Sequence, residues 1–403
     1  MGYNDFSYKA KPTKTQYIIV FLFLCVSGNP VIIYGSEWSS IIMLVAMLVI
    51  NIAHKTTLFS KDVCLWMGGF ITLMVMQYLI LPHVSIPANI NFLFKLYLAF
   101  LVVVFLQYSF RYAYLRVIYC LALISLLFFS IQIVLGPIGV DFDRYKTLFV
   151  YNTISTGSGL IRNSGMFWEP GAFQGFIMIV PLLYLNNLKY LWNNYRKECV
   201  ILTITLFTTQ STTGYIAFAV LLSYALITSE LPFATKTIML LFIALIIIMS
   251  FSYFSFLGDK ISTEYEATVK LKENELTWSR MGSFYLDYQN IIKNPIIGNG
   301  FLMEMRYGPL GKYLKGISNG FTGSINMFGI VAMICYYACV FKKLLNYSLL
   351  QKIIFLVIII ILLNGEYYLS YPLFWALLFI DYSLQTDENN RKEKNNSCIN
   401  YSA

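Results

Sequence analysis

The sequence predicts an all-α polytopic membrane protein with about twelve transmembrane helices and two long outer loops. Of its 403 residues, 58% are hydrophobic and only 12% are charged, whereas soluble domains carry about 25% charged residues. The mean hydropathy of +0.64 agrees with this assignment. Apolar runs recur along almost the whole chain, and one helical span needs only about 20 residues. We therefore expect residues 1–403 to form a single integral membrane domain.

Each predicted span is an apolar run that ends at a polar or charged cluster. The runs are 17–33, 38–53, 63–81, 92–108, 113–135, 171–185, 200–209, 212–228, 237–257, 324–341, 349–363 and 367–382. The joins at 209–212 and 364–370 are each open to interpretation as a bend or as a hairpin. Hairpins keep Lys342 and Lys343 on the inner side, which the distribution of basic residues favours.

Basic residues predict which loops stay in the cytoplasm, because Lys and Arg in short loops remain inside. With the N-terminus inside, the inner segments hold 17 basic and 8 acidic residues, whereas the two long outer loops are nearly balanced. The net charge of +9 is therefore topological, and it does not form the basic face that nucleic acid would require. The polar tail, residues 387–403, is expected to be a disordered cytoplasmic segment.

Cysteine and histidine spacing predicts neither a disulfide framework nor a metal site. The seven cysteines lie in apolar runs, at their ends or in the tail. His54 and His83 are far apart in sequence and join no cluster with metal-ligand spacing. We expect no metal and no cofactor.

Two outer loops, residues 137–170 and 258–322, are much longer than the others. Loops of this length are usually functional or disordered, and both loops carry aromatic residues such as Trp168 and Tyr288, which disordered segments lack. Function is therefore expected in these loops. The alternative is that the rings form an interfacial aromatic belt that only anchors helices.

The first long loop ends in a motif that combines a guanidinium with a carboxylate. Residues 162–173 place Arg162 seven positions before Glu169, and Pro170 and Gly171 suit the start of a helix. Glu169 is thus expected at or near the N-cap, where the helix dipole favours its ionised form. It can deprotonate an acceptor hydroxyl, or it can simply cap the helix and pair with Arg162.

A second outer turn, residues 210–214, is rich in hydroxyl groups at the membrane edge. Ser211 and Thr212 can bind a phosphate or a sugar there. The alternative is ordinary capping of the following helix by one of these two residues.

In the second long loop, residues 279–292 predict an amphipathic helix that lies with its apolar side on the bundle. Arg280 and Asp287 share a helix face, and Arg suits bidentate capture of phosphate. Pro295 ends the helix, and Gly298 and Gly300 permit close backbone approach to a ligand. Other cations nearby, including Arg306, are either ligand contacts or solvated surface charges.

Lys95 is the one basic residue well inside a predicted span boundary. Charges inside a span are functional hypotheses by default. The competing explanation is that its side chain snorkels to the outer headgroups.

Three segments, in this order and spacing, resemble the signature of Wzy-type O-antigen and exopolysaccharide polymerases. Residues 162–171 resemble an Arg-x-Ser-Gly-x-Phe-x-Glu-Pro-Gly motif, residues 209–214 a Ser-Thr-Thr-Gly turn, and residues 279–300 a Ser-Arg helix followed by Pro-x-x-Gly-x-Gly. The resemblance covers about residues 140–377. O-antigen ligases share a looser form of the pattern.

This resemblance implies a metal-independent glycosyltransferase with a GT-C-like fold in the bacterial inner membrane, with its active site facing the periplasm. The growing glycan would move from undecaprenyl pyrophosphate to the next undecaprenyl-pyrophosphate-linked repeat unit of a surface polysaccharide. The implied partners are this lipid-linked oligosaccharide, the lipid bilayer and, as a further candidate, a chain-length regulator protein.

The resemblance also assigns roles to individual positions. Arg162 and Arg280 would bind phosphate, and Glu169 would act as the base. The expected substrate contacts are Lys95, Trp168, Ser211, Thr212, Asp287, Tyr288 and Arg306.

Two other functions remain open at this point. The O-antigen ligases of this group resemble one another in carrying a histidine in the second long outer loop. Residues 258–322 contain no histidine. A polymerase is therefore favoured over a ligase. A flippase for the same lipid-linked sugar would also need many spans, but it would be expected to have short loops and internal repeats.

Overall fold

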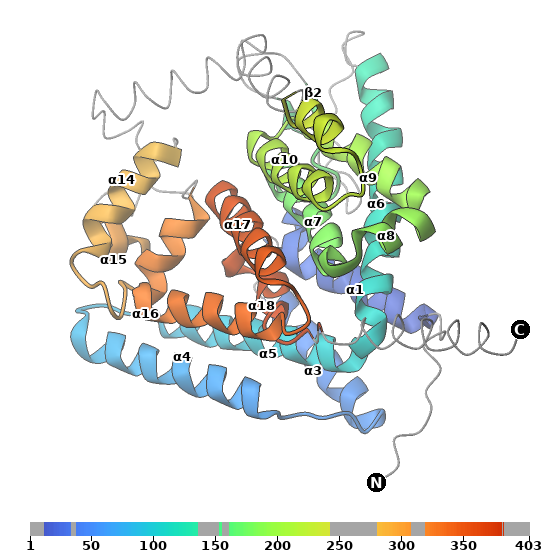
Figure 1. Cartoon of the computed structure of the whole chain (residues 1–403). Helices are drawn as coiled ribbons and strands as arrows, with labels where there is room; N and C mark the ends of the chain where they lie inside the picture. Colours follow the sequence, from blue (N-terminus) through green and yellow to red (C-terminus); the bar gives the residue numbers. More distant parts are fainter. Residues whose placement is uncertain are drawn as a thin grey trace, which may run out of the picture.

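The computed structural model describes residues 12–33, 38–135, 153–154, 161–241, 280–307, 319–380 and 382. This part of the chain is predominantly α-helical (Figure 1). Its strands are β1 (Thr153–Ile154) and β2 (Ile161–Arg162), a short antiparallel pair in which Thr153 faces Arg162. The predicted all-α class is therefore confirmed for the described residues.

The described helices lie on most of the predicted apolar runs, with ends that differ by up to six residues. The described part of the run 367–382 holds only a 3-10 turn and a helix of 5 residues. The predicted span 237–257 lies mostly, and the predicted tail 387–403 wholly, outside the described residues. In the first half they are α1 (Lys14–Gly28), α2 (Pro30–Ile33), α3 (Ser39–Ala53), α4 (Lys61–Ile80), α5 (Ile86–Leu106), the 3-10 turn η1 (Gln107–Ser109) and α6 (Phe110–Leu135). Then follow α7 (Pro170–Leu183), η3 (Leu185–Asn187), α8 (Leu188–Asn194), α9 (Arg196–Thr208) and α10 (Thr212–Ile227). The last group is α14 (Arg280–Ile291), α15 (Met303–Tyr307), α16 (Gly320–Lys343), α17 (Leu349–Gly365), η5 (Tyr368–Ser370) and α18 (Pro372–Ala376).

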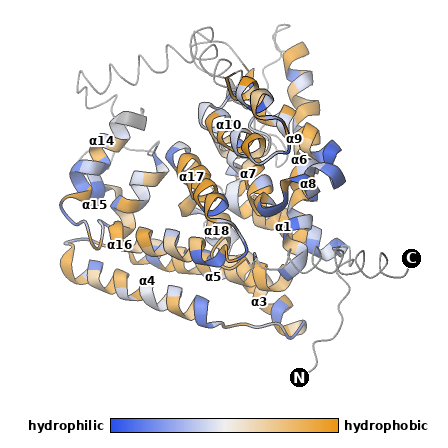
Figure 2. Cartoon of the chain, viewed as in Figure 1, coloured by the Kyte–Doolittle hydropathy of each residue, from blue (hydrophilic) through white to orange (hydrophobic). Residues whose placement is uncertain are grey.

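Three described stretches are long and apolar enough to cross a membrane, namely Lys61–Ile80, Ile86–Leu135 and Gly320–Lys343. A fourth is Pro170–Leu183 taken with Leu185–Asn194, two helical segments that meet at a 50° bend. Shorter apolar helices accompany them, and Figure 2 shows apolar residues concentrated on helices such as α4, α5 and α17. These helices indicate a membrane-embedded protein, and the total of twelve spans remains a prediction.

The predicted separation of the fourth and fifth spans occurs at η1. Gln107 has a φ of +42°, which interrupts the helix. In Figure 1, α5 and α6 run in clearly different directions on either side of this turn. A continuous apolar stretch of sequence is thus divided by one residue in an uncommon backbone conformation.

Both uncertain joins are hairpins. The ring of Phe207 near the end of α9 lies 5.6 Å from Tyr215 and 5.9 Å from Phe218 in α10, so α10 turns back along α9. At the second join, Tyr382 lies 5.9 Å from Tyr347 and 5.7 Å from Phe355. The chain after α17 therefore returns to the start of that helix, partly as η5 and α18.

Helix α16 is broken at Gly329, which has a φ of +81° and a ψ of 162°. The segment 295–300 fills the break: Asn299 donates its backbone N–H to the carbonyl of Asn326 (2.7 Å), and Ile330 donates to that of Pro295 (2.8 Å). Backbone groups freed by the break are thus satisfied inside the protein, as burial requires.

The predicted role of Gly298 is corrected by this arrangement, and that of Gly300 remains a prediction. Both have positive φ angles. A Cβ on Gly298 would meet the backbone of Gly329 and Met327, so this glycine permits close approach to α16 and not to a ligand. The side chain of Gln77 in α4 binds both segments, because its N–H groups donate to the carbonyls of Ile297 (2.6 Å) and Met327 (3.0 Å).

Aromatic packing holds α4, α5, α16 and α18 together. The buried ring of Trp375 lies between 5.1 and 5.9 Å from Phe70, Phe92, Phe328 and Tyr336. Edge-to-face pairs of this kind are each worth about 0.5–1.5 kcal/mol beyond area burial. The short helix α18 is therefore anchored by one large side chain.

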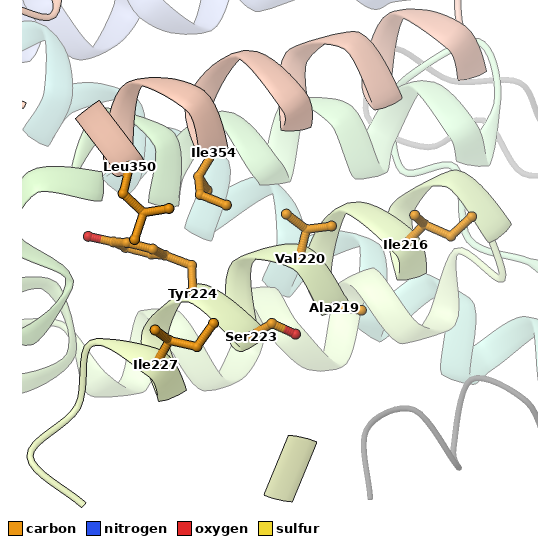
Figure 3. Close-up of a pocket in the computed structure, with 8 residues that line it drawn as sticks. All are labelled: Ile216, Ala219, Val220, Ser223, Tyr224, Ile227, Leu350 and Ile354. Atoms are coloured by element: carbon orange, nitrogen blue, oxygen red, sulfur yellow. The ribbon is translucent and has the colours of Figure 1, made fainter. Parts of the chain in front are cut away.

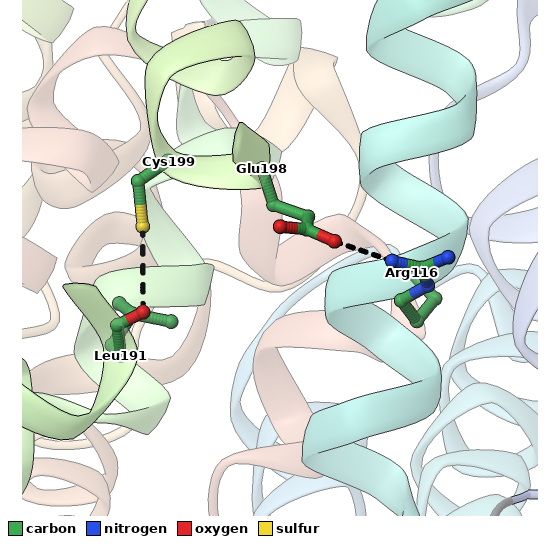
Figure 4. Close-up of polar contacts among 4 residues, drawn as sticks. All are labelled: Arg116, Leu191, Glu198 and Cys199. Carbon is green, nitrogen blue, oxygen red and sulfur yellow. Dashed lines mark hydrogen bonds and ion pairs between the residues drawn. The ribbon is translucent and has the colours of Figure 1, made fainter. Parts of the chain in front are cut away.

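Polar contacts join segments predicted to lie on the same side of the membrane. Ion pairs connect Arg116 with Glu198 (Figure 4), Lys189 with Glu230 and Lys343 with Asp62, and all six residues lie in predicted inner segments. The predicted outer segments likewise contact one another, as described below.

Candidate functional site

The first-loop motif is threaded between α1, α6 and α9. Asn163 donates its side-chain N–H to Ser125 (3.2 Å) and Thr208 (3.0 Å), and Asn29 donates to the carbonyl of Met166 (2.9 Å). Gly165 has a φ of +56°, which lets the chain turn back there. Much of this motif therefore has a structural role that fixes where residues 168 and 169 begin α7.

Arg162 holds the end of α9. Its Nε and one terminal nitrogen donate to the carbonyls of Thr209 (3.2 Å) and Gln210 (3.1 Å). A cation at this position also complements the negative end of the helix dipole. The structure thus connects Arg162 to the hydroxyl-rich turn, and its predicted contact with phosphate remains a proposal.

The hydroxyl-rich turn packs tightly against α7 and α17. Ser211 is the N-cap residue of α10 but makes no side-chain capping bond, so the simple capping explanation does not hold for it. Ser211 is buried and Thr212 is half-buried. Gly365 of α17 faces Thr213, and Gly214 faces Gln174 of α7 so closely that a side chain on either glycine would collide.

Glu169 occupies the predicted N-cap position of α7, with extended backbone (φ −158°, ψ 158°). Its side chain is exposed and makes no capping bond. The alternative in which Glu169 caps the helix through its carboxylate is therefore not seen, and its role as the base remains a prediction.

A carboxylate outside the set of residues predicted from the sequence lies beside this motif. Trp168 donates its Nε1–H to Oε2 of Glu366 (3.1 Å), and Glu366 is 7% exposed. A Cβ on Gly171 would come within 3.0 Å of the other carboxylate oxygen, and a Cβ on Gly320 would come as close to the Glu366 carbonyl. The one available sequence signal was an acid three residues after the predicted apolar run 349–363.

Trp168, Tyr371 and Lys95 form a partly exposed group next to Glu366. The rings of Trp168 and Tyr371 lie 4.9 Å apart with a tilt of 35°. Lys95 donates to the carbonyl of Ser370 (3.0 Å), and its ammonium lies 5.3 Å from the Tyr371 ring centre. Lys95 thus binds the segment that follows Glu366. The snorkelling explanation did not predict such a contact with the protein.

The predicted orientation of the amphipathic helix is wrong. The helix itself is confirmed as α14, but its polar side is buried, with Ser283, Asp287 and Asn290 packed inward. Phe284 and Tyr288 point outward, and Tyr288 is 55% exposed. The reason is that α16 offers polar partners to α14, while a membrane-embedded protein can leave its apolar residues outside. Tyr288 therefore belongs to the outer surface of α14.

Asp287 is the centre of a buried polar cluster that we name the Asp287 cluster: Asp287, Arg306, Tyr307, Thr322 and Asn326. The carboxylate is fully buried and accepts hydrogen bonds from Tyr307, from Thr322 (2.6 Å) and from Asn326 (2.9 Å). Burial raises the pKa of this carboxyl, against the opposing effect of the nearby Arg306 charge. The cluster joins α14, α15 and α16.

Arg306 is 2% exposed and lies between two tyrosine rings. The guanidinium carbon is 5.2 Å from the Tyr307 ring centre and 5.6 Å from that of Tyr367. One terminal nitrogen donates to the Tyr307 hydroxyl (3.0 Å) and to the Gly323 carbonyl (3.2 Å). In this arrangement Asp287 and Arg306 stabilise the protein, and their predicted contact with substrate would require the cluster to open.

Arg280 begins α14, but its side chain lies outside the described residues. Its predicted meeting with Arg162 is therefore untested. Figure 1 shows β2, which carries Arg162, and α14 apart from each other.

Residues 365–368 contact both predicted outer loops. Gly365 contacts the hydroxyl-rich turn, Glu366 binds Trp168, and Tyr367 packs on Arg306. Tyr368 donates its hydroxyl to the carbonyl of Gly171 (2.7 Å) at the start of α7. This segment, which we name the 365–368 linker, brings elements of both predicted outer loops to one place.

An apolar groove lies between α10 and α17 (Figure 3), with a volume of about 320 Å³. It is lined by Ile216, Ala219, Val220, Ser223, Tyr224, Ile227, Leu350 and Ile354. Leu350 and Ile354 lie near Tyr224, whereas Gly365 lies near Thr213, so the two helices are antiparallel. The groove therefore begins about one turn from the hydroxyl-rich turn and runs toward the other end of α10.

Within the described part of the chain, no group of three or more His, Cys, Asp or Glu residues is arranged to hold a metal ion. No protein-family model, curated protein or solved structure matches the chain.

Proposed function

We propose that the protein is a polymerase of lipid-linked oligosaccharide repeat units in the bacterial inner membrane, with its active site facing the periplasm. It transfers the growing glycan from undecaprenyl pyrophosphate to the next undecaprenyl-pyrophosphate-linked unit. The observation that carries the proposal is the 365–368 linker, in which Glu366 binds Trp168 of the first predicted outer loop and the next residue, Tyr367, packs on Arg306 of the second.

The proposed chemistry needs a carboxylate near an acceptor hydroxyl and cations near the departing pyrophosphate. Glu169 and Glu366 both lie at the start of α7 and provide the acidic groups. Arg162 lies at the end of α9 and donates to the carbonyls of Thr209 and Gln210, which directly precede Ser211 and Thr212. We assign the pyrophosphate to this side of the site, with Arg280 as a further cation from the second loop.

The proposed carrier also needs an apolar path for its prenyl chain. The groove between α10 and α17 starts about one turn from the hydroxyl-rich turn and is lined mostly by aliphatic side chains. A diphosphate held at that turn would have its prenyl chain in this groove, because burying apolar surface there is favourable at about 25 cal/mol per Å².

One observation favours a transporter as a second candidate, namely the break in α16 at Gly329. Broken helices near bound substrates are common in transporters. In this protein, however, the segment 295–300 occupies the break and satisfies its backbone groups. A flippase would have to displace this segment, so we rank it second.

The deciding experiment is deletion of the gene in its native strain, followed by analysis of the surface polysaccharide. Loss of the polymerase leaves single repeat units on the surface lipid in place of long chains. Complete absence of units would identify a flippase instead, and long free chains that are not joined to the surface lipid would identify a ligase. Either of these two results would contradict the proposal.

A further inference from the structure

We infer that the outward side of α14 anchors the second predicted outer loop in the lipid bilayer, among the phospholipids of the leaflet that surrounds the Ile80 end of α4. This side carries an exposed apolar row, which we name the α14 face: Phe284, Tyr285, Tyr288, Ile292 and Ile296. The inference goes beyond the proposed function and does not depend on it, because it concerns contact with phospholipid and not the transfer reaction.

The members of the α14 face are spaced to lie on one side of the helix. Phe284, Tyr288 and Ile292 are four residues apart, Tyr285 lies beside them, and Ile296 follows in the turn after α14. Their exposed fractions run from 36% at Tyr285 to 66% at Ile296. The bundle therefore does not cover this side, and exposed apolar patches mark contact with lipid or with a protein partner.

The α14 face adjoins the exposed apolar surface of α16. Ile330 donates its backbone N–H to the carbonyl of Pro295 (2.8 Å), and a Cβ on Gly329 would lie 2.0 Å from the carbonyl oxygen of Ile296. Directly after this contact, α16 exposes three aliphatic side chains, Ile330, Val331 and Ile334. Because α16 is long and apolar enough to cross a membrane, these side chains indicate a lipid-facing surface next to Ile296.

The end of α4 adjoins the same segment. Gln77 donates to the carbonyl of Ile297 (2.6 Å), and the three residues that follow it, Tyr78, Leu79 and Ile80, are all exposed. Helix α4 is also long and apolar enough to cross a membrane. Figure 1 shows α14 at the margin of the molecule, beside α16. The α14 face thus continues the exposed apolar surfaces of two candidate spans.

The backbone after α14 meets the requirement that lipid imposes on non-helical chain. The N–H groups of residues 298–300 donate to the carbonyls of Asn294, Asn326 and Met327. The bonds from Ile330 and Gln77 satisfy two carbonyls of the same segment. Non-helical backbone at membrane depth is tolerated where its polar groups are buried in protein. This segment directs its polar groups inward and leaves apolar side chains outside.

Charge and ring type favour a phospholipid surface over a protein partner. Residues 282–300 contain one acid, Asp287, and it is buried against α16. Lys293 is exposed, and its ammonium donates to Oδ1 of Asn290 (2.7 Å). A lysine beside a row with two tyrosines is typical of helices at the membrane interface, where phosphate headgroups are anionic and tyrosine rings lie at headgroup level.

The test measures whether the α14 face meets lipid or water in the full-length protein, reconstituted in phospholipid liposomes without any polyprenyl carrier. Spin labels are attached singly to Tyr288→Cys and Ile292→Cys in a cysteine-free background. Their collisions with oxygen, which concentrates in lipid, are compared with those of a water-soluble nickel chelate. We expect an oxygen-to-nickel ratio about threefold or more above that of Glu230→Cys, because the apolar face of an interfacial helix lies about 5–10 Å into the boundary between headgroups and acyl chains. Glu230 is the exposed control in water, and Val75→Cys in α4 is the control in lipid.

A second measurement uses the unmodified wild type, so it does not depend on the folding of the cysteine-free protein. The liposomes then contain a phospholipid with a photoactivatable group on its acyl chain, and mass spectrometry locates the adducts. We expect adducts on residues 284–296 at a yield comparable to that on residues 71–79 of α4, which expose apolar side chains of a candidate span.

Two results would overturn the inference. A ratio equal to that of Glu230→Cys, with no adducts on residues 284–296, would show that the α14 face lies in water. Labels that neither reagent reaches, again without adducts, would show that a protein covers the face, and dipolar broadening between labels would identify that protein as a second copy of the chain. Both results leave the proposed function intact, because the gene deletion tests it separately. A lipid-facing α14 would stand even if that deletion contradicted the polymerase.

Discussion

Gly329 has a φ of +81°, and a side chain at this position would collide with the carbonyl oxygen of Ile296. The contact joins the broken helix α16 to the segment that follows α14. It is possible only because glycine has no Cβ and adopts positive φ at little cost. The second loop is thereby connected to a predicted span at one point in the backbone.

Replacement of Gly329 should therefore be severely destabilising. For Gly329→Ala we expect a loss of more than about 3 kcal/mol, because backbone strain of about 1–3 kcal/mol adds to a direct clash with backbone atoms. The thermal unfolding midpoint in detergent measures the effect. The control is Gly69→Ala in α4, where an added Cβ meets no atom within 4 Å. An unchanged midpoint for Gly329→Ala would show that α16 is not broken there.

The Asp287 cluster predicts a large effect from a single acid. Asp287→Ala leaves three buried donors without their acceptor, and each costs about 1–3 kcal/mol. We expect a total loss of more than about 3 kcal/mol, measured by chemical or thermal unfolding. Asp62→Ala is the matched control, because Asp62 is about half exposed and pairs with Lys343 at the surface. Surface pairs contribute about 0–1 kcal/mol, so comparable losses in the two variants would contradict the cluster.

The raised pKa of Asp287 predicts a dependence of stability on pH. Because the folded state holds the proton more tightly than the unfolded state, whose ordinary pKa is 3.8, this contribution is complete below that value. It is lost as the pH rises through the higher folded pKa, at a rate of up to about 1.4 kcal/mol per pH unit. Unfolding of the wild type and Asp287→Asn should be compared between pH 4 and 7. The stability advantage of the wild type should shrink with rising pH, and a growing advantage would show that the Arg306 charge dominates.

Arg162→Lys tests the role of the guanidinium at the end of α9. Lysine lacks the planar fork that reaches two successive carbonyls, Thr209 and Gln210. We expect faster hydrogen exchange in residues 209–213 and a loss of about 1–2 kcal/mol of stability. The control is Arg196→Lys, where the exposed guanidinium lies over the Trp192 ring. Equal protection of the turn in both variants would assign Arg162 to another role.

The orientation of the chain can be tested with two exposed lysines. In a cysteine-free background, Lys293→Cys should react with a membrane-impermeant maleimide in spheroplasts. Lys189→Cys should react only after permeabilisation, because it lies in a predicted inner segment. Labelling with the opposite preference would put α14 in the cytoplasm and remove its access to a periplasmic donor.

The apolar runs were sufficient to predict where most helices lie. Runs of spanning length and their polar ends are local properties, so α3, α4 and α6 begin within three residues of the predicted positions. The N-cap position of Glu169 was also predictable, because Pro170 and Gly171 are local signals. The α9–α10 hairpin followed from the positions of basic residues.

The orientation of α14 could not be predicted in the same way. Hydrophobic periodicity identifies two faces of a helix, but in a membrane the apolar face can be the outer one. Whether Tyr288 or Asp287 points inward depends on Thr322 and Asn326 of α16, which lie 35 and 39 residues away from Asp287.

Composition and apolar runs thus indicate a helical membrane protein and the positions of most described helices, and local motifs predict the segments in which chemistry is expected. Trp168 donates to Glu366, a residue 198 positions away in sequence. A local sequence pattern cannot predict a contact over that separation. Helix formation is governed by neighbours in sequence, whereas a site is made by side chains that packing brings together. For this reason Glu366 became visible only when α7, α16 and α17 were seen to converge on it.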